Sequence, residues 1–325
     1  MRMKAVVYHR YGGTDELGIE EIPKPKPRNN EVLVKVHAAS VNSWDWDLVT
    51  GRPKILRLLS GLFKPRHKII GSDISGTIEE IGNHVSRWKV GDKVYGDISG
   101  NGFGAFAEYV SVPENILSKI PQKMSFEQAA TIPQAGILAL QGLRDSGKIG
   151  SNQKILINGA GGGVGTFAIQ YASMFNAEIT AVDRKDKLEF LQKIGAHHVI
   201  DYESVDYTRN GSEYDIILDV IAKRSRKDYL RALAQNGKFV LVGGAMSTIL
   251  AVLIMGGIAS KKGQKKLSIL AHNPNSNDLD YLSDLFNEGI IDPIIDKIFP
   301  LSETNQAVQY IGEGNCKGKI VIKII

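Results

Sequence analysis

Lys154-Ile-Leu-Ile-Asn-Gly-Ala-Gly-Gly-Gly-Val-Gly165 is the stretch that decides the fold, because a short apolar run is followed by five glycines in seven residues. The spacing Ala160-x-Gly162-x-x-Gly165 is a one-residue variant of GxGxxG, placed between a strand and a helix predicted over Val164–Phe175. In this pattern the middle glycine admits a pyrophosphate and the last one packs the helix on the strand. Free N–H groups at the helix start favour an anion. We therefore expect a dinucleotide to bind at Ala160, Gly162, Gly163, Val164 and Gly165.

Two other interpretations of these glycines are weaker. A P-loop needs a lysine and then a hydroxyl residue after its last glycine, whereas Thr166 and Phe167 follow Gly165. The second interpretation is a turn whose glycines serve only tight packing. It does not explain Asp183, which lies at the end of the next predicted strand. An acidic residue at that place accepts hydrogen bonds from a ribose hydroxyl.

Strands and helices alternate around the glycine loop. Strands are predicted at 154–158, 178–183, 198–202, 214–220, 238–242 and 267–271, with helical stretches between most of them. This alternation predicts an α/β fold with a parallel, doubly wound sheet. A helix over Ser125–Ser146 is expected to precede it, with Ser125 as the N-cap and Gln128 completing a capping box.

The beginning of the chain has a different pattern and is mostly β. Strands are predicted at 3–9, 31–39, 74–81 and 107–112, between turns rich in Gly and Pro. The tail from 300 to 325 also has β character and ends in a predicted strand over 319–325. We therefore expect a mostly β domain over 1–124 that is completed by 296–325, and a dinucleotide domain over 125–295.

Residues around Asp183 leave the choice between NAD and NADP open. Asp183 favours NAD, because a carboxylate binds the ribose diol and repels a 2′-phosphate. Arg184, Lys185 and Lys187 follow at once and would neutralise that phosphate, unless they are only the solvated start of a helix.

Composition limits the class of protein. The single cysteine, Cys316, excludes an intramolecular disulfide framework and fits a reducing compartment. The longest apolar run, 249–259, is shorter than the roughly 20 residues of a membrane span, and the N-terminus has no apolar signal region. The net charge of +5 is mild, and the basic run 261–266 lacks interleaved aromatic residues. We expect a soluble cytoplasmic protein, with no membrane or nucleic-acid partner.

Several segments carry a resemblance to a known family. They are Val32-Leu-Val-Lys-Val-His-Ala-Ala-Ser-Val-Asn42, Ile70-Gly-Ser-Asp-Ile-Ser-Gly76, Trp88-Lys-Val-Gly-Asp-Lys-Val-Tyr-Gly96, Gly104-Ala-Phe-Ala-Glu-Tyr-Val110 and Gly195-Ala-His-His-Val-Ile-Asp-Tyr202, with the glycine loop itself. Together they resemble the medium-chain dehydrogenases/reductases, in the zinc-independent quinone oxidoreductase branch. The resemblance implies a GroES-like catalytic domain, a Rossmann cofactor domain and a homodimer.

The resemblance also implies a reaction without zinc. Zinc-dependent relatives hold the metal with a Cys and a His where this chain has Asn42 and Ser72, and neither of these is a good zinc ligand. Without a Lewis acid, alcohol oxidation loses its main driving device. The expected activity is hydride transfer from NADPH, with NADH as the alternative, to a quinone or an α,β-unsaturated carbonyl. An alcohol or aldehyde oxidoreductase of the same fold and a non-catalytic NADPH-binding protein are the alternatives.

Site residues follow from the same comparison. Asn42 and Asp45 are the candidate catalytic residues, unless they only stabilise the loop 40–51 through Asx-type turns. Trp44 and Trp46 either wall an aromatic substrate or fill core. Relatives often carry Tyr at Asp47 and Thr at Leu138, which puts the substrate class in doubt. The remaining cofactor-binding residues are Asp183, Arg184, Lys187, Tyr202, Val220, Gly243 and Gly244, where Lys187 and Tyr202 match residues that clasp a 2′-phosphate. The segment 245–263 either covers the site or forms a subunit contact.

Overall fold

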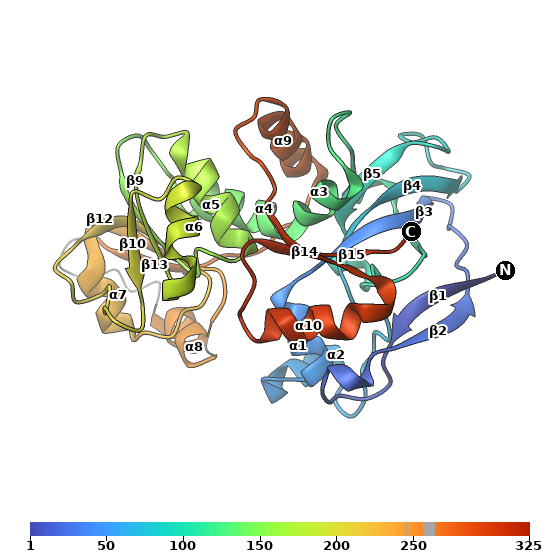
Figure 1. Ribbon diagram of the computed structural model, residues 1–325, viewed down its shortest axis with the longest axis horizontal. Helices are drawn as coiled ribbons and strands as arrows, with labels where there is room; N and C mark the ends of the chain where they lie inside the picture. The colour runs from blue at the N-terminus through green and yellow to red at the C-terminus, as the bar shows by residue number, and fades with distance from the viewer. Residues whose placement is uncertain (245, 256–263) are drawn as a thin grey trace. The chain divides into compact units, whose positions relative to one another are not determined.

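The computed structural model describes residues 1–244, 246–255 and 264–325, and these divide into two compact units. Unit 1 comprises Met1–Gln134, Pro274–Glu288 and Pro293–Ile325, and unit 2 comprises Ala135–Asn273 and Gly289–Asp292 (Figure 1). Residues 245 and 256–263 of the segment expected to cover the site or join subunits lie outside the described residues, and so do residues 261–263 of the basic run 261–266.

Unit 2 is built on a parallel sheet. Its described strands are β8 (Lys154–Asn158), β9 (Glu178–Asp183), β10 (His198–Asp201), β11 (Tyr214–Asp219), β12 (Leu233–Leu241) and β13 (Lys266–Ile269), in the spatial order β10-β9-β8-β11-β12-β13. Neighbouring strands are all parallel. From β8 the chain adds β9 and β10 on one side of the sheet and then β11, β12 and β13 on the other. The predicted doubly wound α/β sheet is therefore confirmed.

Helices connect these strands and cover the sheet. They are α4 (Pro133–Leu140), a π-helical turn over Gln141–Gly147, α5 (Gly163–Ser173), η6 (Lys185–Lys187), α6 (Leu188–Lys193), α7 (Arg226–Ala232) and α8 (Met246–Met255). Strands β8 and β11 are apolar and fully buried over Ile155–Ile157 and Ile216–Leu218, as expected for a sheet covered on both faces.

Unit 1 is a mostly β unit. Its larger sheet has the order β14-β15-β3-β4-β5-β7, with β6 also paired to β3, and a separate hairpin joins β1 to β2. The strands are β1 (Arg2–Val7), β2 (Gly18–Pro23), β3 (Glu31–Val41), β4 (Asp73–Ile81), β5 (Lys93–Asp97), β6 (Tyr109–Pro113), β7 (Leu117–Lys119), β14 (Ile295–Pro300) and β15 (Lys319–Lys323). Since β15 pairs antiparallel with β3, the chain returns to its N-terminal unit as predicted.

Short helices complete unit 1. They are η1 (Thr14–Glu16), α1 (Ser43–Thr50), η2 (Lys54–Leu56), α2 (Arg57–Ser60), η3 (Ser99–Asn101), η4 (Glu114–Ile116), α3 (Phe126–Thr131), α9 (Ser276–Asn287), η7 (Leu301–Glu303) and α10 (Thr304–Gly312). The tail from 300 to 325 was expected to have β character; its final strand is present as β15, but α10 precedes it. In the described part of the chain, no helix is long and apolar enough to cross a membrane.

The long helix predicted over Ser125–Ser146 is also wrong in part. Its start is confirmed, since the Ser125 hydroxyl accepts from Gln128 N at 3.1 Å and the Gln128 side chain accepts from Ser125 N. The helix then ends at Thr131 because Pro133 has no N–H to continue the ladder. A new helix, α4, begins at that proline.

The units differ from the predicted domain boundaries in two places. Helix α3 lies in unit 1, although the predicted boundary follows residue 124. Helix α9 lies there too, although 125–295 was expected to be one domain. The reason is packing: the Tyr95 hydroxyl on β5 donates to Leu279 O on α9 at 2.7 Å, and Ser118 of β7 donates to Ser276 O.

Candidate functional site

The glycine loop follows β8 and leads into α5. A Cβ atom on Gly165 would lie 2.4 Å from the backbone of Ala160, so this glycine lets the helix pack directly on the loop. Gly162 is different, because a Cβ there would meet only Gly159 O, at 3.6 Å. The protein's own packing therefore leaves space above Gly162, at the start of an eleven-residue helix. These residues fit a dinucleotide pyrophosphate.

Two glycines that the GxGxxG pattern does not explain have packing reasons. Gly159 has a φ of +78°, and a Cβ on it would lie 2.9 Å from the Ile221 side chain. A Cβ on Gly161 would lie 2.6 Å from the Lys187 side chain, and the Gly161 N–H donates to the Asp183 carboxylate at 2.7 Å. The loop is thus held from both neighbouring strand ends.

The ends of β9 and β10 bring three predicted residues together. Lys187 Nζ lies 3.5 Å from Asp183 Oδ1, and both side chains are almost fully buried. Tyr202 follows β10, its N–H donates to Asp183 O at 3.3 Å, and the residue is 40% exposed. Burial is the main cause of the raised pKa of the Tyr202 hydroxyl, which stays protonated and able to donate. Arg184 donates its backbone N–H to Asp183 and pairs with Asp186.

Val220, Gly243 and Gly244 lie where β11 and β12 end. A Cβ on Gly243 would lie 2.9 Å from Val220 O, and one on Gly244 would lie 2.4 Å from Ala222 O. Both glycines therefore allow the two loops to approach each other closely at the carboxyl edge, the edge at which ligands bind in open α/β sheets.

Beneath this edge lies a buried carboxylate that sequence analysis missed. Asp219, the last residue of β11, accepts from Asn158 Nδ2 at 2.7 Å, from Ile221 N at 3.0 Å and from the Tyr207 hydroxyl at 3.3 Å. Burial raises the pKa of Asp219 to about 6, while these donors lower it. The contacts tie the ends of β8 and β11 together under the glycine loop. No local pattern signals this role, because Tyr207 lies in an irregular segment.

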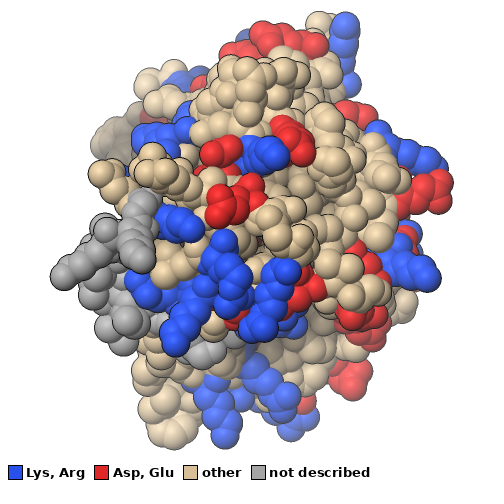
Figure 2. All heavy atoms as spheres, turned by 90° about the vertical axis from the view of Figure 1, so that its left-hand side faces the viewer, with Lys and Arg blue, Asp and Glu red and all other residues tan. Residues whose placement is uncertain are grey.

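Positive charge gathers on one face of unit 2. Figure 2 looks onto the left-hand side of Figure 1, where α7 lies, and Lys and Arg side chains crowd that face. The segment after β11 and through α7 is itself rich in cations, with Lys223, Arg224, Arg226, Lys227 and Arg231. Two of the cations are paired, Arg224 with Asp206 and Arg231 with Asp228.

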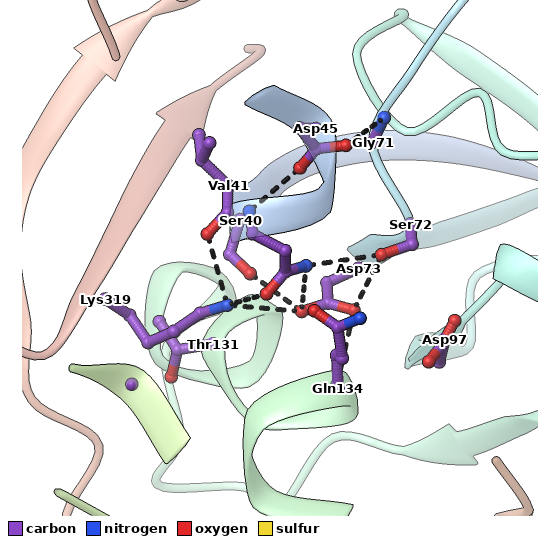
Figure 3. A network of polar contacts seen from close by, with 12 residues as sticks. Ser40, Val41, Asp45, Gly71, Ser72, Asp73, Asp97, Thr131, Gln134 and Lys319 are labelled. Carbon is purple, nitrogen blue, oxygen red and sulfur yellow. Dashed lines mark hydrogen bonds and ion pairs between the residues drawn. The ribbon is translucent and has the colours of Figure 1, made fainter. Parts of the chain in front are cut away.

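Unit 1 has a buried polar network around Asp73, shown in Figure 3. Asp73 Oδ2 accepts from the Ser40 hydroxyl at 2.9 Å and from Asn42 Nδ2 at 3.0 Å, and lies 3.4 Å from Lys319 Nζ. Its other oxygen accepts from Ser72 and from Gln134 N. Burial raises the pKa of Asp73, and the Lys319 ammonium opposes that shift.

Lys319 lies near the C-terminus, at the start of β15, and orients Asn42. Its Nζ donates to Asn42 Oδ1 at 2.5 Å and to Val41 O at 3.3 Å, in addition to its contact with Asp73. The Asn42 amide nitrogen in turn donates to Ser72 and Asp73. Both amide hydrogens of Asn42 therefore have acceptors within the protein. Its expected role as a donor to a substrate stays a prediction.

Asp45 holds the start of α1. One of its oxygens accepts from Asn42 N at 2.8 Å, and the other accepts from Gly71 N at 3.0 Å. Burial raises the pKa of Asp45 to about 7, while these two backbone donors lower it. The contacts join the loop before α1 to the loop before β4. The expected catalytic role of Asp45 stays a prediction.

Two neighbouring tryptophans have different environments. Trp46 packs in the core of unit 1 against α10, where a Cβ on Gly312 would lie 2.4 Å from its ring. Trp44 instead lines a cavity together with Asp47. Leu138 lies half-buried on α4. Within the described residues, no group of three or more His, Cys, Asp or Glu side chains is placed to hold a metal ion.

A sheet with this strand order, a pyrophosphate-type glycine loop and a mostly β companion unit is typical of dinucleotide-dependent oxidoreductases. Comparison with known proteins agrees. Residues 28–122 match the family model described as the alcohol dehydrogenase GroES-like domain, and residues 194–322 match the one described as zinc-binding dehydrogenase.

Relatives match the whole chain. The chloroplast envelope quinone oxidoreductase homolog of Arabidopsis thaliana is 31% identical over 99% of this chain and 98% of its own length. The NADPH-dependent alkenal/one oxidoreductase of the same plant is 29% identical over 98% of this chain and 79% of its own. The structure of the quinone oxidoreductase from Coxiella burnetii matches all of both chains with a TM-score of 0.90 and 29% identity. The chain belongs to the medium-chain dehydrogenase/reductase family, in its quinone oxidoreductase-like branch.

The two motif glycines make a matched pair of variants. Gly162→Ala should leave the melting temperature unchanged, because its Cβ has space, but should weaken binding of NADPH by about tenfold or more where the pyrophosphate meets the backbone. Gly165→Ala should lower the stability of the cofactor-free protein by ~1–3 kcal/mol, because its Cβ collides with the Ala160 backbone. Thermal unfolding and NADPH titration measure the two effects. Equal NADPH affinity in Gly162→Ala and wild type would contradict this assignment.

Lys319→Met should destabilise the protein strongly. It removes the cation beside a fully buried carboxylate and leaves the Asn42 amide oxygen without its ammonium donor. Breaking a buried pair by removing one partner costs roughly 3–5 kcal/mol. Chemical denaturation measures the loss, with the exposed neighbour Lys323→Met as the control. A loss no larger than that of the control would show that the ion pair is dispensable.

Proposed function

We propose that this protein reduces quinones or α,β-unsaturated carbonyls with NADPH and without zinc. The glycine loop is the observation that carries the proposal. A helix begins where the structure leaves space above Gly162, and Gly165 packs so closely on the Ala160 backbone that a Cβ would collide with it. Together these features fit a dinucleotide. A bound nicotinamide cofactor supplies the hydride. The names of the two Arabidopsis relatives, a quinone oxidoreductase homolog and an alkenal/one oxidoreductase, support the substrate class.

The residues at the zinc-ligand positions support the metal-free reaction. Asn42 and Ser72 hydrogen-bond to each other at 3.2 Å and share Asp73 as an acceptor. An amide and a hydroxyl are poor zinc ligands, and here both are already engaged. Asp45 and Lys319 hold these side chains from either side. We therefore favour positioning roles for Asn42 and Asp45 over direct contact with the substrate.

Preference for NADPH follows from how Asp183 is used. Its oxygens accept from the backbone of Gly161 and of Arg184, so the carboxylate serves to hold the glycine loop. Lys187 lies beside it and offsets its negative charge, which removes much of the repulsion toward a 2′-phosphate. Tyr202 adds a hydroxyl donor at the end of the adjacent strand.

A homodimer and a cytoplasmic location complete the proposal. Strand β13 is the last strand in the order of the unit 2 sheet, and such an edge offers backbone donors and acceptors to a second copy. Sedimentation velocity reads the oligomeric state. The one cysteine, Cys316, agrees with a reducing compartment.

Oxidation of NADPH with a panel of quinones and enals tests the function. We expect turnover with both substrate classes after extensive chelation of metals, because no step needs a Lewis acid. Simple alcohols with NADP⁺ serve as the comparison and should react far more slowly. Loss of activity on chelation that zinc restores would overturn the metal-free reaction. Tight NADPH binding without turnover of any acceptor would favour the non-catalytic alternative.

The cofactor preference is tested by Lys187→Ala. Loss of a charge-assisted contact to the 2′-phosphate should weaken NADPH by ~1.5–3 kcal/mol more than NADH, which lacks that phosphate. Titration with both cofactors measures the difference. Lys193→Ala is the matched control, because Lys193 is an exposed lysine on α6 that pairs with Glu189. An equal loss for both cofactors would argue that Lys187 serves Asp183 alone.

A further inference from the structure

Helix α1 presents one face to a cavity inside unit 1. Trp44, Asp47 and Leu48 are spaced three and four residues apart, so they share one side of the helix. They line a cavity of about 210 Å³ together with Leu56, Ser60, His67 and Phe103. Cavities of about 150 Å³ already admit benzene. This space is large enough for a substituted ring.

The walls of the cavity are mostly apolar and aromatic. The Phe103 ring stands edge-on to Trp44 at 5.4 Å and to His67 at 5.5 Å. Leu48 and Leu56 add aliphatic surface, and the Ser60 hydroxyl is already used in donating to Leu56 O at 3.1 Å. Such walls favour a flat apolar group over a strongly hydrated one.

One group contradicts this apolar character, namely the carboxyl of Asp47. Within the described residues no hydrogen bond or ion pair reaches its side-chain oxygens, and His67, the other titratable residue of the cavity, is not bonded to it. Burial alone raises the pKa of Asp47 to about 6, so the carboxyl is largely ionised at neutral pH. Asp45, two residues earlier, has two backbone donors. A partly desolvated carboxylate without a donor is costly unless a ligand supplies one.

We propose that this cavity receives a ring of the substrate that carries a hydroxyl group, and that Asp47 selects that substrate by accepting its hydrogen bond. A bond from a hydroxyl to a carboxylate is charge-assisted and discriminates strongly between substrates with and without the donor. Aromatic walls on one side and a single acceptor on the other match a phenol. A substrate with a carboxylate in this place is repelled by Asp47. The proposal rests on the reductase function above and names its substrate class.

Matched enones test the proposal. The probes are 4-phenylbut-3-en-2-one and its para-hydroxy and para-carboxy derivatives, and kcat/KM is measured with NADPH for wild type, Asp47→Asn and Asp47→Leu. The ring substituent also changes the reactivity of the enone, but that effect cancels when the hydroxy-to-phenyl ratio is compared between variants. We expect the ratio to fall about tenfold or more in Asp47→Leu and by less in Asp47→Asn, whose amide oxygen still accepts. The para-carboxy enone should gain in Asp47→Leu.

A control variant and a binding measurement complete the design. Asp15→Leu makes the same change at an exposed carboxylate of unit 1 and should leave the ratio unchanged. The saturated ketone 4-(4-hydroxyphenyl)butan-2-one is titrated calorimetrically without cofactor, so binding is read even if no enone is reduced. It should bind wild type about tenfold or more tightly than Asp47→Leu. An unchanged ratio and equal binding, or no binding to wild type, would overturn the proposal. Absence of turnover with intact Asp47-dependent binding would overturn the reductase function instead.

Discussion

A buried charge must be compensated inside the protein by an opposite charge or by hydrogen-bond donors, and in unit 1 this constraint pairs Asp73 with Lys319. The two residues lie in β4 and β15, 246 residues apart in the chain. Their contact places the C-terminal strand beside β3 at the point where the loop to α1 begins. Asn42, Ser40 and Ser72 take their orientations from the same pair. The candidate site of this unit is therefore arranged around a buried ion pair.

Other aspartates of the protein differ in whether hydrogen-bond donors compensate the burial of their carboxylates. Asp45 and Asp219 are buried at loop junctions, and each accepts hydrogen bonds from backbone N–H groups. Asp183 does the same for the glycine loop and also pairs with Lys187. These carboxylates are satisfied within the fold and hold loops in place. Asp47 is partly buried and receives no donor from the residues that the structure describes, which is why we assign it to a ligand and not to the structure.

The two units bring their candidate site residues together in different ways. In unit 2 the carboxyl ends of parallel strands bring Asp183, Val220 and Gly243 to one edge, so topology alone gathers the residues. In unit 1 the sheet is mostly antiparallel, and polar side chains from β3, β4 and β15 must meet through specific hydrogen bonds. Because of this difference, the residues expected to bind the cofactor lie together at one sheet edge. Asn42 and Asp45, in contrast, make contacts that stabilise the fold of unit 1.

The amino-acid sequence by itself determined the alternation of strands and helices in unit 2, the glycine loop and the capping box at Ser125, because periodicity, steric limits and capping act over a few residues. It also determined the return of the last strand to the first unit. Only the tertiary structure decided that α9 packs with unit 1, that Pro133 divides the long helix, and that α10 interrupts the β tail. It alone paired Asp73 with Lys319 and left Asp47 in a cavity. The physical reason is that burial and charge pairing depend on residues distant in the chain, and no local pattern records which distant side chains will meet.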